Sequence, residues 1–196
     1  MAHPKHTLPP ETALEQIRNQ VTGCKKCPLH EERINAVFGE GPWDAPIMII
    51  GEGPGANEDK QGRPFVGRAG KLLDQLLEQQ GLSRKKNVFI ANIVKCRPPK
   101  NRVPKKQEVE ACFPYLTRQI QYVDPAIILL LGATAIKSYR GEGKEKISDI
   151  RGKWSREDGR LVMATFHPAA VFRNRTYQGY IEEDLETIAG KYRNGL

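Results

Sequence analysis

The stretch Ile47–Gly55 reads IMIIGEGPG, four large apolar residues followed by a turn of glycine, proline and one glutamate. An apolar run of this length between Pro46 and Gly51 predicts a strand that is buried on both faces. Glycine lets the backbone of the following turn approach a bulky neighbour closely. Because open parallel sheets bind ligands at the carboxyl ends of their strands, we expect a ligand at this turn.

Further apolar stretches predict strands, and segments with helical spacing separate them. Strands are expected at 86–96, 126–132 and 161–166, and helices at 11–21, from about 69, and at 105–123, 133–139 and 177–192. Helical connections imply right-handed crossovers and a parallel sheet covered on both faces. The predicted fold is therefore α/β, a three-layer α/β/α sandwich around a mainly parallel sheet of about four strands.

The remaining segments are predicted to be less regular. Residues 34–46 are expected to form a short strand and a loop, and residues 141–160 a hairpin or loop. The chain is expected to stay irregular from Ala56 until the helix near Ala69, because glycine and proline interrupt it.

Length and composition predict one globular domain over residues 1–196, with a loose, proline-rich tail at 1–10. No apolar window is long enough for a membrane span or a signal-peptide core, so we expect a cytosolic protein. The formal net charge of +8 suits a polyanionic partner such as DNA. Charge alone is weak evidence, since many basic proteins bind no nucleic acid.

The cysteines are spaced as Cys24-x2-Cys27 and Cys96-x15-Cys112. A reducing cytosol disfavours disulfides, and two cysteines three residues apart can point their sulfurs at one metal centre. Zinc ribbons generally use two short C-x2-C pairs, whereas iron–sulfur clusters accept irregular frames of four thiolates. The alternative is a set of unrelated buried cysteines. A cluster here would clamp the amino-terminal segment to the loop after the second strand.

The turn Gly51–Ala56 nominally matches the dinucleotide-binding pattern G-x-G-x-x-G/A. Two features disfavour that interpretation. No helix is expected directly after the turn, and the second strand ends near Asn92 rather than at an acid for a ribose hydroxyl. Glu52, Glu58 and Asp59 form an acidic patch, which suits a sugar cation better than a phosphate.

Three residues at predicted strand ends or loops are candidates for the site: His167, Asn92 and Phe65. His167 directly follows a predicted strand and precedes Pro168, so its ring should emerge at the same sheet edge as the turn 51–55 and Asn92. Each residue also has a structural interpretation. His167 could be a hydrogen-bonded structural histidine, Phe65 a core residue and Asn92 a turn cap.

Taken together, several segments closely resemble family 4 uracil-DNA glycosylases. They are GCKKCPL at 23–29, GEGPGANEDKQGRPFVGRAG at 51–70, ANIVKCRPPKNRVP at 91–104, LGATA at 131–135 and FHPAAVFRN at 166–174. The resemblance spans nearly the whole chain from about residue 20. It implies a monomeric, monofunctional enzyme that excises uracil from DNA in base excision repair. It also implies a [4Fe-4S] cluster on four cysteines, Cys24, Cys27, Cys96 and Cys112.

The resemblance further implies how uracil is held. The turn at Glu52, Gly53 and Pro54 would contact the base through its backbone, Phe65 would stack on it, and Asn92 would read its edge. A side-chain amide can accept from uracil N3–H and donate to O4, whereas cytosine presents the opposite pattern at both atoms. The base must leave the stack to be read in this way.

Catalytic roles follow from the same resemblance. His167 is expected to donate to uracil O2, where negative charge develops as the base leaves. Glu58 matches the position that excludes the thymine methyl group. The carboxylate that positions water is open between Glu52 and Glu58, and Glu52 is favoured.

Several basic residues are expected to contact the DNA. The loop 172–175 is expected to enter the duplex, and six side chains are expected along the phosphates, namely Lys100, Arg102, Lys105, Arg151, Lys153 and Arg173. For several of them a solvated charged face is the plainer interpretation. A different class of function, a non-catalytic nucleic-acid-binding module held by a metal, would explain the charge and the cysteines. It would not explain Asn92 and His167 at one rim.

Overall fold

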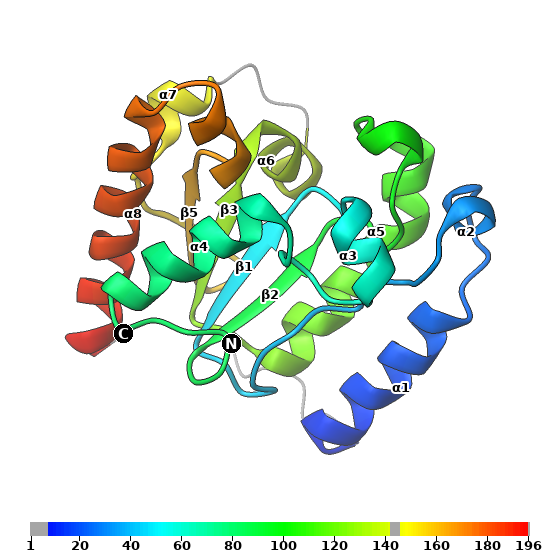
Figure 1. Ribbon diagram of the computed structural model, residues 1–196. Coiled ribbons are helices and arrows are strands. Elements are labelled where there is room, and N and C mark those ends of the chain that lie inside the picture. The colour runs from blue at the N-terminus through cyan, green and yellow to red at the C-terminus, as the bar shows by residue number, and fades with distance from the viewer. Residues whose placement is uncertain (1–7, 142–145, 196) are drawn as a thin grey trace.

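One sheet lies at the centre of the fold (Figure 1). In this computed structural model, which describes residues 8–141 and 146–195, five strands form the sheet in the order β2-β1-β3-β5-β4. The bounds are β1 (Ile47–Gly51), β2 (Val88–Asn92), β3 (Ile127–Leu131), β4 (Ser155–Glu157) and β5 (Arg160–Thr165). The four predicted strands are parallel to one another, and the additional strand, β4, pairs antiparallel with β5 at the edge.

Helices cover both faces of this sheet (Figure 1). They are α1 (Pro10–Thr22), α2 (Leu29–Glu32), α3 (Ala56–Gln61), α4 (Arg68–Gln79), α5 (Lys106–Val123), α6 (Gly132–Arg140), α7 (Ile147–Ile150) and α8 (Thr176–Arg193), with short 3-10 helices η1 (Pro99–Asn101) and η2 (Pro168–Phe172). The predicted helices are confirmed, and each predicted helix end agrees within one residue. The three-layer α/β/α architecture is therefore confirmed as well.

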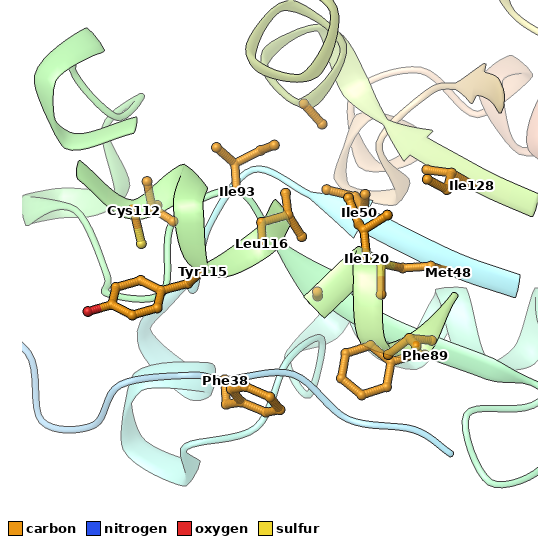
Figure 2. Close-up of a cluster of buried hydrophobic side chains, with 14 of the residues drawn as sticks. Phe38, Met48, Ile50, Phe89, Ile93, Cys112, Tyr115, Leu116, Ile120 and Ile128 are labelled. Carbon is orange, nitrogen blue, oxygen red and sulfur yellow. The ribbon is translucent and has the colours of Figure 1, made fainter. Parts of the chain in front are cut away.

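The two faces of β1 belong to two separate hydrophobic clusters, because successive side chains of a strand point to opposite faces. Met48 and Ile50 join the cluster under α1 and α5, where Figure 2 shows them with Leu116, Ile120 and Phe89. The alternate residues of β1 join a second cluster under α4 and α8. All five residues of the strand are buried, which is why its sequence is continuously apolar.

The register of the strands determines which residues meet at the carboxyl edge. Gly51 at the end of β1 pairs with Asn92 at the end of β2, and Leu131 of β3 pairs with Thr165 of β5. The turn after Gly51 and the residues after Thr165 therefore leave the sheet at the same edge.

The prediction of a short strand within residues 34–46 was wrong, because the structure, which describes all of this segment, has no strand there. This segment lies along the outer side of β2 and forms only an isolated bridge, Glu40 to Ile90. Gly39 and Gly41 have φ angles of 140° and 149°. A Cβ at Gly41 would lie 2.4 Å from the carbonyl oxygen of Val88. The backbone here packs too closely and too irregularly to continue a regular ladder.

The irregular stretch predicted after Ala56 was also wrong at its start, because α3 begins at that residue. The helix reads ANEDKQ and ends at Gly62, whose φ of 67° is the left-handed conformation favoured for glycine at helix ends. Six polar or small residues carry no apolar periodicity, so the pattern offered no helical signal. One argument against a dinucleotide-binding turn, the missing helix, therefore does not hold.

The remaining expectations concern the tail and the region before β5. α1 begins at Pro10, and most of the predicted tail, residues 1–7, lies outside the described residues. The hairpin expected in 141–160 is confirmed as β4–β5, preceded by α7, while residues 142–145 lie outside the described part. Among the helices of the described residues, none combines the length and apolar character that crossing a membrane requires.

Candidate active site and cysteine cavity

A cavity of about 650 Å³ opens at the carboxyl edge of the parallel strands. Every residue predicted to contact uracil lines it: Glu52, Gly53, Pro54, Glu58, Phe65, Asn92 and His167. The cavity also receives side chains from the end of β3 and from the loop before α5. The predicted convergence of three distant segments at one rim is thus confirmed, although the roles of the individual residues are proposals.

Asn92 supplies the best-defined polar group of this cavity. The side chain is 2% exposed, and its Oδ1 has no hydrogen-bond partner within the described residues. A Cβ at Gly51 would lie 2.6 Å from this oxygen and 2.6 Å from Cζ of Phe65. Gly51 therefore lets the amide and the ring come together. A buried acceptor without a donor is uncommon in native proteins and indicates a ligand that donates to it.

Phe65 lies beside the imidazole of His167, with ring centroids 5.6 Å apart. Its φ of 51° is left-handed, which is unusual for a bulky residue. The buried guanidinium of Arg84 holds this conformation by donating to the carbonyl oxygens of Pro64 at 2.7 Å and Phe65 at 2.9 Å. Asp74 pairs with the same guanidinium. Sequence reasoning missed Arg84, since it lies in the basic stretch RKK about 20 residues after the loop that it holds.

The carboxylate of Glu58 is occupied by the backbone. Its two oxygens accept from the N–H groups of Gly55 at 3.1 Å, Val66 at 2.9 Å and Gly67 at 2.7 Å. These bonds tie the start of α3 to the loop before α4. They also place a negative charge at the N-terminus of α3, the end at which the phosphate of a dinucleotide would bind. This charge disfavours a dinucleotide-binding turn.

Glu52 differs from Glu58 in this respect. It is half-buried at the cavity wall, and its carboxylate makes no hydrogen bond or ion pair within residues 8–141 and 146–195. Its backbone carbonyl accepts from Val94 N–H at 3.1 Å, which fixes the turn against the loop after β2. Of the two carboxylates, that of Glu52 is therefore the one left for a water molecule or a substrate.

The protonation state of His167 follows from its contacts. Ala169 N–H donates to its Nδ1 at 3.1 Å, so in the neutral ring the proton resides on Nε2. Burial lowers the pKa of His167 to about 4, with Glu58 raising it and Arg173 lowering it to smaller extents. At neutral pH the ring is an uncharged N–H donor. Gly132, with a φ of 84°, leaves room for it, because a Cβ there would lie 3.0 Å from Cβ of His167.

The six basic residues expected along DNA fall into three groups. Arg102 and Arg173 line the cavity. Arg102 is bound to Glu108 by two hydrogen bonds, and the guanidinium of Arg151 is bound to Asp184 on α8. The other residues are exposed at the surface without lining the cavity: Lys100, Lys105 and Lys153. The donors of Arg151 are directed toward α8, which disfavours a contact of this residue with DNA.

The four cysteines line a single small cavity, although they come from distant parts of the chain. All four are free thiols. Arg33 donates to Sγ of Cys96 at 3.0 Å, and the backbone N–H of Lys95 donates to Sγ of Cys112 at 3.2 Å. Within the described residues, no three His, Cys, Asp or Glu side chains converge tightly enough to hold one metal ion. The sulfurs therefore surround a volume rather than a point.

Burial disfavours thiolates in this cavity. It raises the pKa of Cys27 and Cys96 above the ordinary value and that of Cys112 to about 11. In the protein alone these groups would remain protonated at neutral pH. A cationic centre that binds thiolates would reverse this preference.

Lys95 connects the cysteine cavity to the candidate active site. Its side chain is fully buried, and Nζ donates to the carbonyl oxygen of Asn92 at 2.8 Å and to Oε1 of Gln119. Its backbone N–H contacts Cys112. Lys95 therefore ties the end of β2 at Asn92 to α5, where Cys112 and Gln119 lie. Sequence patterns did not indicate this role, since a buried lysine has no local signature.

Comparisons with known proteins agree with this geometry. A sequence profile described as "Uracil DNA glycosylase superfamily" matches residues 38–188. The chain belongs to this superfamily. The matched range contains every residue named above as lining the cavity at the carboxyl edge of the sheet, together with Cys96 and Cys112, while Cys24 and Cys27 precede it.

Relatives place the glycosylase in the type-4 branch. It is 49% identical to the type-4 uracil-DNA glycosylase of Sulfurisphaera tokodaii, over 90% of this chain and 83% of that protein. It is 45% identical to the type-4 uracil-DNA glycosylase of Thermotoga maritima, over 90% of this chain and 93% of that protein. The similarity to a type-5 uracil-DNA glycosylase of Pyrobaculum aerophilum is lower, 31% identity over 78% of this chain.

Proposed function

We propose that this glycosylase excises uracil from DNA by hydrolysing the N-glycosidic bond, which leaves an abasic site as the first intermediate of base excision repair. The observation that carries the proposal is the unpaired Oδ1 of Asn92, buried in the same cavity as the uncharged imidazole of His167. An acceptor and a donor that line one cavity match the N3–O4 edge and the O2 atom of a flipped uracil. The names of the type-4 relatives support the same activity.

Base recognition rests on the hydrogen-bonding pattern of Asn92. Its Oδ1 accepts from uracil N3–H, and its NH₂ group donates to O4. Cytosine offers an acceptor at N3 and a donor at C4, so both bonds would become repulsive. Phe65 provides the face on which the base stacks, and the backbone of Glu52, Gly53 and Pro54 contacts the rest of the ring. Glu58 acts through the loops that it ties together, which keep the wall beside C5 in place.

As the N-glycosidic bond breaks, positive charge develops on the sugar and negative charge on the base. The N1–C1′ electron pair departs with uracil, and Nε2–H of His167 stabilises the charge that collects at O2. A neutral donor suits this task, because it keeps its proton and needs no charged partner. Glu52 orients a water molecule whose oxygen bonds to C1′, and the proton that water loses is released to solvent.

Four cysteines of the glycosylase are proposed to hold a [4Fe-4S] cluster: Cys24, Cys27, Cys96 and Cys112. The donor set fits, since four thiols surround one cavity and two of the sulfurs accept N–H groups, as cluster thiolates commonly do. When bound, the cluster would supply a structural cross-link between the segment after α1 and α5. We further propose that the enzyme works as a cytoplasmic monomer with one domain.

The proposed cluster predicts the iron content of the protein and its dependence on Cys112. Wild-type protein prepared without oxygen should contain about four irons per chain and be brown, and Cys112→Ser should lose most of this iron. The Tm should fall by about 10 °C, because binding energy at such a site is folding energy. Tyr115→Phe, which alters the same cavity without removing a sulfur, should retain the iron. Stoichiometric zinc in the wild-type protein would contradict the proposal.

The proposed activity is tested by incubating the purified protein with a uracil-containing oligonucleotide and measuring free uracil by chromatography. We expect release of uracil from that strand and none from a matched strand with thymine or cytosine. Binding of the DNA without release of uracil would instead support the non-catalytic nucleic-acid-binding module.

A further inference from the structure

A second groove lies beside the uracil cavity, between α3 and α4. Its volume is about 510 Å³, and its polar and aromatic lining comes from Asn57, Gln61, Arg68, Lys71, Gln75 and Phe172. Asn57, Gly67 and Arg68 line both the groove and the uracil cavity, so the two spaces adjoin. None of the described residues that line the groove is acidic. The groove therefore offers cations and amides next to the site of the flipped base.

The two cations of this groove are unpaired. Arg68 and Lys71 are exposed, and neither makes an ion pair within residues 8–141 and 146–195. Arg102 and Arg151, by contrast, are bound to carboxylates. A charge without an internal partner is available to an external anion, so the groove offers positive charge that Arg102 and Arg151, which are paired with carboxylates, do not.

Arg68 is also held in place. Its guanidinium lies over the ring of Phe172, 3.9 Å from the centroid. A stacked guanidinium keeps its N–H edges free to donate, and the ring restricts its rotation. Phe172 belongs to η2, directly after His167. The catalytic loop and the cation of the groove are thus joined by one contact.

From these contacts we infer that the groove binds the sugar–phosphate backbone beside the flipped nucleotide, with Arg68 and Lys71 on its phosphates. The inference rests on the proposed function, because a strand whose uracil occupies the cavity must continue past the cavity mouth. Phosphates recur about every 3.4 Å along the axis of a strand. A strand that leaves the cavity along the shared wall therefore brings a phosphate flanking the flipped nucleotide to Arg68. The three amides donate to further phosphate and sugar oxygens.

The test uses Arg68→Gln, Lys71→Gln and the double variant, with Lys85→Gln/Lys86→Gln as the control. The control removes two exposed charges from the turn before β2, at the opposite edge of the sheet. Binding of a single-stranded oligonucleotide carrying a uracil analogue that resists hydrolysis is measured across salt concentrations. Each groove substitution should lower the slope of log K against log salt by about one and weaken binding about tenfold at moderate salt. The control should behave as wild type.

A second arm locates the phosphate. Methylphosphonate, which is uncharged, replaces the phosphate on either the 5′ or the 3′ side of the uracil nucleotide. The effect of Lys71→Gln should disappear with one of these two oligonucleotides and persist with the other. Free uracil should bind Lys71→Gln as it binds the wild type, which shows that the adjoining cavity is intact.

Two results would overturn the inference. One is a double variant whose salt slope and affinity equal those of the control, and the other is an effect that persists with both methylphosphonates. Either result would leave uracil release by the wild type unaffected. Conversely, a wild-type protein that binds DNA through the groove but releases no uracil would reject the proposed function alone.

Discussion

Replacement of His167 by alanine should lower kcat by about 100- to 1,000-fold, the usual loss when one preorganised donor to a developing anion is removed. The reason is local: Ala169 N–H occupies Nδ1, so in the proposed mechanism Nε2–H is the group left to donate to the departing base. Single-turnover rates of uracil release at saturating enzyme measure the chemical step directly. DNA affinity, measured separately, should change little.

His167→Gln provides the graded control. The glutamine amide can still donate a hydrogen bond, so this variant should recover part of the rate that alanine loses. If both variants cleave uracil at the wild-type rate, His167 has no catalytic role and its burial is structural.

The low pKa of His167 adds an expectation about pH. Its folded-state pKa of about 4 lies below the value near 6.5 expected in the unfolded chain. Protons therefore bind the unfolded state preferentially between these values. The stability associated with the neutral ring is present above about pH 6.5 and is lost as pH falls toward 4. Urea denaturation at pH 7 and pH 4.5 should show a smaller loss for His167→Ala than for the wild type.

Substitution of Asn92 by aspartate should lower kcat/KM for uracil by about 10- to 100-fold, since the hydrogen bond to O4 is lost and a buried group left without its partner costs about 1–3 kcal/mol. A carboxylate can accept from N3–H but cannot donate to O4. In its protonated form it would instead match the pattern of cytosine. The ratio of uracil to cytosine excision should therefore fall, as measured with two oligonucleotides that differ in one base.

Asn87→Asp is the matched control, because Asn87 flanks the other end of β2 and uses its Oδ1 to accept from Ser83 N–H. An aspartate keeps that acceptor, so activity and base preference should stay at the wild-type level. Should Asn92→Asp discriminate between uracil and cytosine as well as the wild type does, recognition must reside in other groups of the cavity.

The placement of the site could be predicted because it depends on the ends of strands. Apolar runs ending at Gly51 and before His167 are visible in the sequence, and parallel strands bring their carboxyl ends to one edge. Asn92 could be placed there for the same reason. By contrast, α3 was missed because a short polar helix has no apolar period, and the bridge at Glu40 was mistaken for a strand.

Pairing between distant side chains could not be predicted. Arg84 and Phe65 are 19 residues apart, and Arg151 and Asp184 are 33 apart. No local sequence pattern predicts which of the many charged residues will form an ion pair or hydrogen bond with each other. The sequence alone could not distinguish Arg151, which is bound to α8, from Arg68, which stacks on Phe172 and makes no ion pair within the described residues.

The order of apolar and polar residues along the chain thus determined the layers, the direction of the strands and the edge of the sheet that holds the site. It could do so because the spacing of buried apolar residues differs between strands and helices and is visible in the sequence. The tertiary structure decided which polar groups are satisfied and which are left open. Lys95 and Glu58 form hydrogen bonds with backbone groups of the protein. Within the described residues, Oδ1 of Asn92 has no hydrogen-bond partner and the guanidinium of Arg68 has no ion-pair partner, so both can bind a ligand. That division depends on three-dimensional proximity, because a hydrogen bond forms wherever its two partners are packed together, at any separation in sequence.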